Sequence, residues 1–234
     1  MNSLKKILIA FVVFAAIGAY FSSQMVTFFS SLLPAGVILV AFSPTDTFIS
    51  VATIVIAFAA VLTAPIALLE LVRFVSPALY KKEKKGLMKL LPVSIILFVA
   101  GASFGMYVMI FIGLQFFAAL ATSYGVSNMW TLSGLMESLA FIGIAFGVAF
   151  QMPIVLVFLV NYGFLKIEHL VPLRPVVFIG ILILSAFLTP PDALSMLLMA
   201  IPLYGLFEGT LLYLKIFNKK NRKEATKNAK HRNS

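Results

Sequence analysis

The chain has 234 residues, of which 62% are hydrophobic and only 11% are charged, and its formal net charge is +10. Soluble domains average about 25% charged residues, and a soluble chain of this length could not hide so much apolar surface from water. The composition therefore predicts an integral membrane protein and argues against nucleic-acid binding as the reason for the positive charge. The absence of cysteine excludes disulfides, thiolate metal sites and cysteine nucleophiles.

The lysine and arginine residues fall into four clusters, and the three long stretches between the clusters contain none. Each of these stretches holds two apolar segments divided by a turn-rich break, as expected of a hairpin that crosses a bilayer twice. Because cytoplasmic loops retain Lys and Arg, the bias predicts six transmembrane helices with both termini on the cytoplasmic side. The clusters lie at 5–6, 73–89, 166–174 and 215–232, and the stretches without basic residues are 7–72, 90–165 and 175–214.

The apolar runs give the expected spans in chain order. The first run resembles a secretory signal, but the five that follow favour an uncleaved helix. After a long outer loop at about 22–47, we expect Thr45 or Asp46 to cap the second span. The predicted spans are 7–21 (or to 28), 47–70, 88–120, 133–160, 175–188 and 194–214.

The last two spans are short or interrupted. The 14 residues of 175–188 rise only about 21 Å as a helix, less than the hydrocarbon core of about 30 Å, and Pro202 breaks the sixth span. These spans should thin the bilayer locally or lie off-centre. The sequence shows no soluble domain or convincing repeat, so we assign 1–217 to an all-α polytopic transmembrane domain and 218–234 to a basic cytoplasmic tail.

Residues 101–105 read Gly-Ala-Ser-Phe-Gly and match the G-x-S-x-G pattern of serine hydrolases. That motif needs a strand–turn–helix context and a nearby histidine and acid. Here it lies in an apolar helix, and the only histidines are His169 and His231 on the inner side. Packing by small residues explains it better, as it does for Gly143 and Gly147. With no metal-ligand spacing or nucleotide motif, we predict a protein that is not an enzyme and has no metal or cofactor.

Polar residues within the spans are few. Gln151 lies deep in the fourth span, and Glu137, fourteen residues earlier, falls about 40° away on the same helix face. Two interpretations stay open: a polar stripe that meets a partner or a water-filled cavity, or an interfacial Glu137 with Gln151 bonded to a neighbouring helix. Glu208, near the inner end of the sixth span, either pairs with Lys215, reaches the interface, or has a function.

Glu83 is the only acidic residue in a run of four lysines at 81–85. By itself this pattern is explained by charge balance on a solvated loop. The residues alone thus establish a six-helix membrane protein with a basic inner side and go no further.

Several segments, in order over about 40–215, resemble the TatC family, the multispanning core subunit of the twin-arginine protein translocase. The family has six spans, inside termini and two short last helices, which agrees with the topology above. The matching segments are 43–48 (SPTDTF), 74–80 (FVSPALY) followed by Glu83, 146–153 (FGVAFQMP), and 188–192 (LTPPD) followed by 201–204 (IPLY) and 207–208 (FE).

The resemblance implies a subunit that binds twin-arginine signal peptides and assembles with single-span TatA/TatB-type subunits. It would export folded proteins with the protonmotive force, in contact with membrane lipids and as a homo- or hetero-oligomer, without nucleic acid. The location implied is the plasma membrane, or alternatively an organellar energy-transducing membrane. The rival interpretation is a small-solute secondary transporter or another multispanning protein; a transporter predicts inverted repeats and midplane ion ligands, which we do not find.

The resemblance also assigns roles to residues of the first inner loop. Glu83 occupies the position of a family acid implicated in receiving the paired arginines of the signal peptide. A carboxylate suits this role because it binds a guanidinium group through a charge-assisted, bidentate fork. Phe74, Pro77 and Tyr80 fall on the same loop motif and would shape it.

A second set of residues is expected to dock the single-span partners. Gln151 takes the position where the family has Glu or Gln, and Thr189 and Asp192 match the short outer turn between the last two spans. Glu208 belongs to the same C-terminal signature. Met196 departs from the family, which has a polar residue there.

The N-terminal region departs from the family as well. The family usually reads Ser-His-Leu-x-Glu-Leu-Arg-x-Arg before the first span, whereas residues 1–6 read Met-Asn-Ser-Leu-Lys-Lys. Because this segment contributes to signal-peptide binding in the family, we expect that part of the receptor surface to be reduced or rebuilt.

Overall fold

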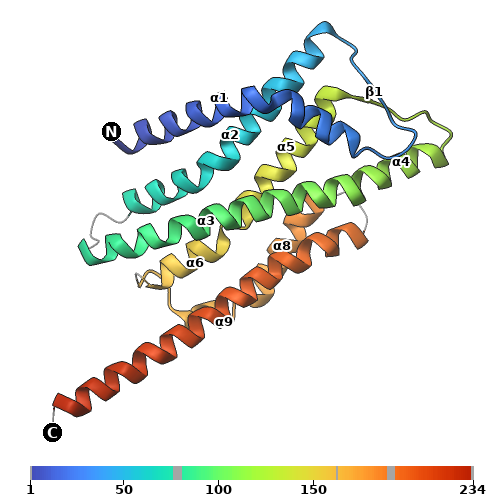
Figure 1. The fold of residues 1–234 in the computed structure, drawn as a ribbon. Helices are drawn as coiled ribbons and strands as arrows, with labels where there is room; N and C mark the ends of the chain where they lie inside the picture. Colours follow the sequence, from blue (N-terminus) through green and yellow to red (C-terminus); the bar gives the residue numbers. More distant parts are fainter. Residues whose placement is uncertain (1, 76–80, 162, 189–192, 233–234) are drawn as a thin grey trace. The chain divides into compact units, whose positions relative to one another are not determined.

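The computed structural model describes residues 2–75, 81–161, 163–188 and 193–232 (Figure 1). The chain divides into two compact units: the first extends to Gln151, and the second contains the helices from Met152 onward.

In the first unit, α1 (Asn2–Ser31) packs against α2 (Pro44–Val75), and α2 in turn contacts α3 (Lys81–Val108) and α5 (Leu132–Ala149) (Figure 1). The helix α3 continues through a π-helical turn, η1 (Met109–Gly113), into α4 (Leu114–Ser123). Together these three segments form the third predicted span.

The second unit consists of α6 (Met152–Asn161), α7 (Ile167–Leu170), α8 (Arg174–Leu188) and α9 (Ala193–Arg232). The prediction that Pro202 breaks the sixth span was wrong, because α9 runs as one helix through this proline. The same helix also passes the expected boundary between membrane domain and tail at 217/218. The hydrophobic core of the second unit lies where α9 packs against α7 and α6. The buried members are Leu170, Phe207, Leu211 and Leu214, with Met152, Leu156, Val157 and Val160 packed against them.

Among the described residues, four helical stretches are long and apolar enough to cross a membrane, and they coincide with the first four predicted spans. The fifth span is present as a shorter apolar helix, as expected from its length. The all-α, polytopic fold class is confirmed; the count of six spans and the side of each terminus stay predictions. The four stretches are Leu4–Ser31, Pro44–Glu70, Pro92–Ser123 and Leu132–Asn161.

A labelling experiment tests the predicted topology. Because the chain has no cysteine, a single cysteine can be placed at Ser30, Ser127 or Asn221 without background. A membrane-impermeant maleimide added from outside should label positions 30 and 127 but not 221. Outside labelling of position 221, or inside-only labelling of position 127, would overturn the topology.

The fourth predicted span, 133–160, is interrupted. The helix α5 ends at Ala149 and α6 begins at Met152, with Phe150 and Gln151 in a turn. Pro153 explains the break, because its ring excludes the carbonyl group four residues earlier, at Ala149, from a regular helix.

The cap of α2 differs from the prediction. Ser43, not Thr45 or Asp46, caps the helix: its Oγ accepts a hydrogen bond from the Thr45 amide at 3.3 Å. Pro44 occupies the first helical position, where a missing N–H costs nothing. Asp46, the third helical residue, reaches back past the cap, and its Oδ2 accepts a bond from the amide of Phe42, the residue before Ser43, at 2.9 Å.

Two short strands join the loops that precede α2 and α5. The strand β1 (Ile38–Val40) pairs in parallel with β2 (Met129–Thr131), with Ile38 opposite Met129. Asp46 adds a further link, because its Oδ1 accepts a hydrogen bond from Ser133 Oγ at 3.3 Å. These strands are not predictable from the sequence, since three residues are too short a run to show alternation.

The glycines of 101–105 pack α3 against α5, as the small-residue interpretation predicts. A Cβ atom on Gly101 would lie 2.6 Å from Phe150 Cγ, and one on Gly105 would lie 2.8 Å from Phe146 Cβ. Phe146 and Phe98 are almost completely buried. This close approach fixes the register of α3 against α5.

Candidate functional site

The residues assigned to signal-peptide binding flank the connection between α2 and α3. Glu83 is the third residue of α3, and Phe74 is the next-to-last residue of α2. Their side chains are not among those described, and Pro77 and Tyr80 lie outside the described residues. A carboxylate near a helix N-terminus is favoured by the helix dipole, which suits an acid at position 83.

Gln151 lies in the turn between α5 and α6 and is 4% exposed. It forms a reciprocal pair with Ser94 of α3: Ser94 Oγ donates to Gln151 Oε1 at 2.5 Å, and Gln151 Nε2 donates to the Ser94 carbonyl oxygen at 3.1 Å. Of the two open interpretations, the structure therefore shows the bond to a neighbouring helix. Glu137 is exposed on α5 and does not share this environment.

Ser94 was not among the residues predicted from the sequence. The available signal was a hydroxyl side chain two residues after Pro92 in an otherwise apolar run. Because a buried amide needs partners, each polar residue within a span predicts a second one opposite it. Sequence alone does not say which one, and here the two lie 57 positions apart.

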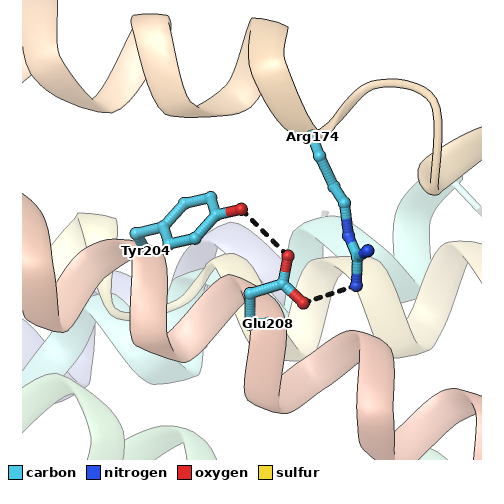
Figure 2. Close-up of polar contacts among 3 residues, drawn as sticks. All are labelled: Arg174, Tyr204 and Glu208. Atoms are coloured by element: carbon cyan, nitrogen blue, oxygen red, sulfur yellow. Dashed lines mark hydrogen bonds and ion pairs between the residues drawn. The ribbon is translucent and has the colours of Figure 1, made fainter.

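Glu208 lies on α9 and is held by two side chains, as Figure 2 shows. Arg174, the first residue of α8, donates from Nη2 to Glu208 Oε2 at 2.6 Å. Tyr204, one turn earlier on α9, donates its hydroxyl to Glu208 Oε1 at 3.0 Å. We call these three residues the Glu208 cluster.

The sequence left three alternatives open for Glu208, of which one was a pair with Lys215; the structure shows an ion pair with Arg174 instead. Lys215 lies two turns further along the same helix, about 10 Å away along the axis. Arg174 begins α8, and its guanidinium group reaches the carboxylate through one nitrogen, Nη2. The cluster thus fastens the start of α8 to α9, and Tyr204 also contacts Phe178 of α8, with the ring centroids 5.3 Å apart.

Thr189 and Asp192, the other residues assigned to partner docking, lie outside the described residues. Met196 is half-buried on α9. The structure consequently describes Gln151 in the first unit and Glu208 in the second, each satisfied by a partner within its own unit.

A third polar contact joins α1 to α2. Lys6 Nζ lies 3.7 Å from Glu70 Oε1, and the Glu70 side chain is 10% exposed whereas that of Lys6 is 60% exposed. The sequence analysis did not single out Glu70, although it and Asp46 are the only acidic residues of the stretch 7–72. Among the described residues, no group of three His, Asp or Glu side chains could hold a metal ion.

These features define a polytopic α-helical membrane protein with satisfied polar pairs between its helices and with an acid among lysines at the start of α3. The family described as "Sec-independent protein translocase protein (TatC)" matches residues 1–202. The chain belongs to this family and is a component of a Sec-independent protein translocase, with a role in transport.

Relatives and solved structures agree with this assignment. The TatCy protein of Bacillus subtilis is 32% identical over 218 residues, which cover 93% of this chain and 86% of that relative. TatC of Escherichia coli K12 is 32% identical over 190 residues, 81% of this chain and 73% of that relative. A crystal structure described as the twin-arginine translocase receptor TatC superposes with a TM-score of 0.74 at 30% identity, covering 91% of this chain and 96% of that one.

Proposed function

We propose that the protein is the signal-peptide receptor and core subunit of a twin-arginine translocase in the plasma membrane. It binds twin-arginine precursors on the cytoplasmic side, assembles with single-span TatA/TatB-type subunits and exports folded proteins with the protonmotive force. The observation that carries the proposal is the likeness to solved receptor structures over 91% of the chain, together with an acid at position 83 in the matching loop.

The receptor chemistry centres on Glu83. Four lysines flank Glu83 in the sequence at 81–85 and disfavour a cationic peptide in general, so the acid has to act locally. A guanidinium group satisfies it with two parallel hydrogen bonds, which an ammonium group cannot do. Recognition of arginine rather than of positive charge follows from this geometry. Phe74, Pro77 and Tyr80 shape the loop around it.

Co-purification tests the receptor function. The intact protein in detergent should retain a precursor with an Arg-Arg pair and lose the same precursor with Lys-Lys. The net charge of the two precursors is equal, so the comparison isolates the guanidinium fork. Equal retention of both precursors, or of neither, would reject the proposal.

For the partner subunits, we propose docking on the short last two spans around Thr189 and Asp192, with Gln151 and Glu208 as supporting residues. The short helix α8 supports this, because a span of 15 residues leaves polar groups of its ends at hydrocarbon depth. Gln151 and Glu208 are already paired within the chain, so their contribution is to position helices.

Photocrosslinking tests the docking face. Probes at Leu188 and Met196 should give adducts with single-span partners, and a probe at Phe111 of the third span should not. Combining Gln151→Leu with Thr189→Val and Asp192→Ala should reduce the adducts far more than Gln151→Leu alone, since one interhelical bond in a membrane contributes only about 0.6 kcal/mol. Adducts from position 111 alone would place the docking face elsewhere.

A further inference from the structure

A cavity of about 470 Å³ lies in the first unit, between α1, α2 and α5. The helices α1 and α5 both pack on α2, and Ile54 and Ala57 of α2 are among the residues that line the cavity. Two further lining residues, Phe21 and Phe28 of α1, are 46% and 58% exposed, so the cavity is open to the surroundings of the helices. We call this cavity the α1–α5 groove.

The α1–α5 groove spans the depth of one leaflet of a bilayer. Ile17 and Phe29 are the first and last groove residues of α1. If the hydrocarbon region begins at Ile7, directly after Lys6, then Ile17 lies about 15 Å along the helix axis, at half of the core thickness of about 30 Å. Phe29 lies about 33 Å along the axis, at the far boundary. The groove therefore extends from the bilayer centre to the boundary opposite Lys6, which is the outer boundary in the predicted topology.

The width of the groove limits what can occupy it. Between Ile17 and Phe29 the groove is about 18 Å long, so its volume corresponds to a mean cross-section of about 26 Å². An α-helix with its side chains is about 10–12 Å in diameter and has a cross-section of roughly 80–110 Å². A transmembrane helix of a partner or of a second copy is thus too wide to enter, whereas one extended hydrocarbon chain fits. Water is a poor occupant, because cavities lined by apolar side chains stay dry.

Of the described residues that line the groove, Gln24 alone has a polar side chain. Its Oε1 accepts a hydrogen bond from Ser23 Oγ at 3.0 Å, and its Nε2 has no acceptor within the described part of the chain. Gln24 lies about 25 Å along α1 from Ile7, within about one turn of the far hydrocarbon boundary. The ester and phosphate oxygens of phospholipids lie at this boundary and accept hydrogen bonds. Because a polar side chain at this depth requires a partner, such an oxygen is a suitable acceptor for the Gln24 amide.

We infer that the α1–α5 groove binds one acyl chain of a phospholipid from the leaflet opposite Lys6, and that Gln24 Nε2 donates a hydrogen bond to an ester or phosphate oxygen of the same molecule. The acyl chain fills the space between α1 and α5 and adds apolar contacts that hold α1 to the rest of the first unit. This lipid differs from the lipids around the other exposed faces, because its removal leaves an empty apolar cavity, which is destabilising. It should therefore stay with the protein in detergent.

Photocrosslinking identifies the occupant of the groove. The full-length protein, with a photoreactive amino acid in place of Phe21, is reconstituted in vesicles of palmitoyl-oleoyl phosphatidylglycerol, purified in detergent and only then illuminated. Mass spectrometry should show an adduct of one phospholipid. Tyr20, which is adjacent, 77% exposed and outside the groove, is the matched control position and should give little lipid adduct, because its lipid exchanges with detergent. Equal lipid adducts at both positions, no lipid adduct at position 21, or a protein adduct there would reject the inference.

Substitutions test the groove and the amide separately. Ala140→Phe places a ring in the groove and should abolish the lipid adduct at position 21, whereas Val148→Phe, at an exposed position of α5 outside the groove, should leave it unchanged. Gln24→Leu should lower the adduct roughly two- to ten-fold, the range for one hydrogen bond, and Thr27→Val, on α1 outside the groove, should have no effect.

Parent-level adducts in Ala140→Phe would show that the lipid lies elsewhere, and parent-level adducts in Gln24→Leu would reject the hydrogen bond. If Ala140→Phe does not fold, Gln24→Leu and the comparison of position 21 with position 20 decide whether the groove holds the lipid.

Discussion

Glu83→Ala is expected to weaken binding of a twin-arginine precursor about ten- to a hundred-fold while the protein reaches the membrane at normal levels. The loss of one partner of a charged hydrogen bond costs about 1.5–3 kcal/mol, which corresponds to that range. Glu83→Gln should weaken precursor binding to a similar extent, because this substitution keeps the shape of the side chain and removes its charge. Crosslinking of a precursor in membrane vesicles and export in cells measure both effects.

The matched control for this prediction is Glu224→Ala. Glu224 is also an isolated acid within a basic segment, in the C-terminal tail that is predicted to be cytoplasmic, so its removal changes net charge equally. Export and crosslinking should be normal in this control. If the Glu83 variants bind and export like the parent protein, position 83 belongs to a solvated face and the receptor assignment of the loop fails.

Breaking the Glu208 cluster is expected to lower the stability of the protein by about 1–2 kcal/mol. The bond from Arg174 to Glu208 is charge-assisted, but the two side chains are 36% and 26% exposed, which reduces its contribution below that of a fully buried pair. Glu208→Ala and Arg174→Ala should therefore lower the thermal unfolding midpoint in detergent by similar amounts, roughly 2–8 °C.

A double-mutant cycle decides whether the two residues act together. The variant with both Glu208→Ala and Arg174→Ala should be little less stable than either single variant, since the same bond is lost in each. Tyr204→Phe removes only the 3.0 Å hydroxyl bond and keeps the ring against Phe178, so it should cost less than about 1 kcal/mol. Additive losses from the two single variants would show that each acts through other contacts.

The sequence predicted which segments cross the membrane because hydropathy and charge bias are summed over about 20 residues each. Helix breaks and helix caps were harder to predict from the sequence, because they depend on single residues. The break between α5 and α6 follows from Pro153, but a proline in a membrane helix is compatible with a kink, a break or a continuous helix. The Ser43 cap was missed by two residues because Ser43, Thr45 and Asp46 are all competent caps, and only the proline at 44 distinguishes them.

Partners of polar residues were the least predictable part of the site. Gln151 and Glu208 were recognised as costly groups that needed partners, but Ser94 and Arg174 are distant in sequence, and their proximity depends on how the helices pack. The same holds for Lys6 and Glu70. The resemblance to the family supplied the remaining assignments, including Glu83, which no rule of composition or spacing singles out.

The parallel pairing of β1 with β2 has a consequence for biogenesis. Ile38 and Met129 are paired although they lie 91 positions apart in the chain. During translation, β1 therefore stays unpaired until β2 has been synthesised. At about 5–20 residues per second the delay is roughly 5–18 seconds, during which α1 and α2 can insert as a hairpin. Formation of the small sheet then requires that the first three predicted membrane spans have been synthesised, and premature arrest of translation would leave an unpaired strand accessible to quality-control proteases.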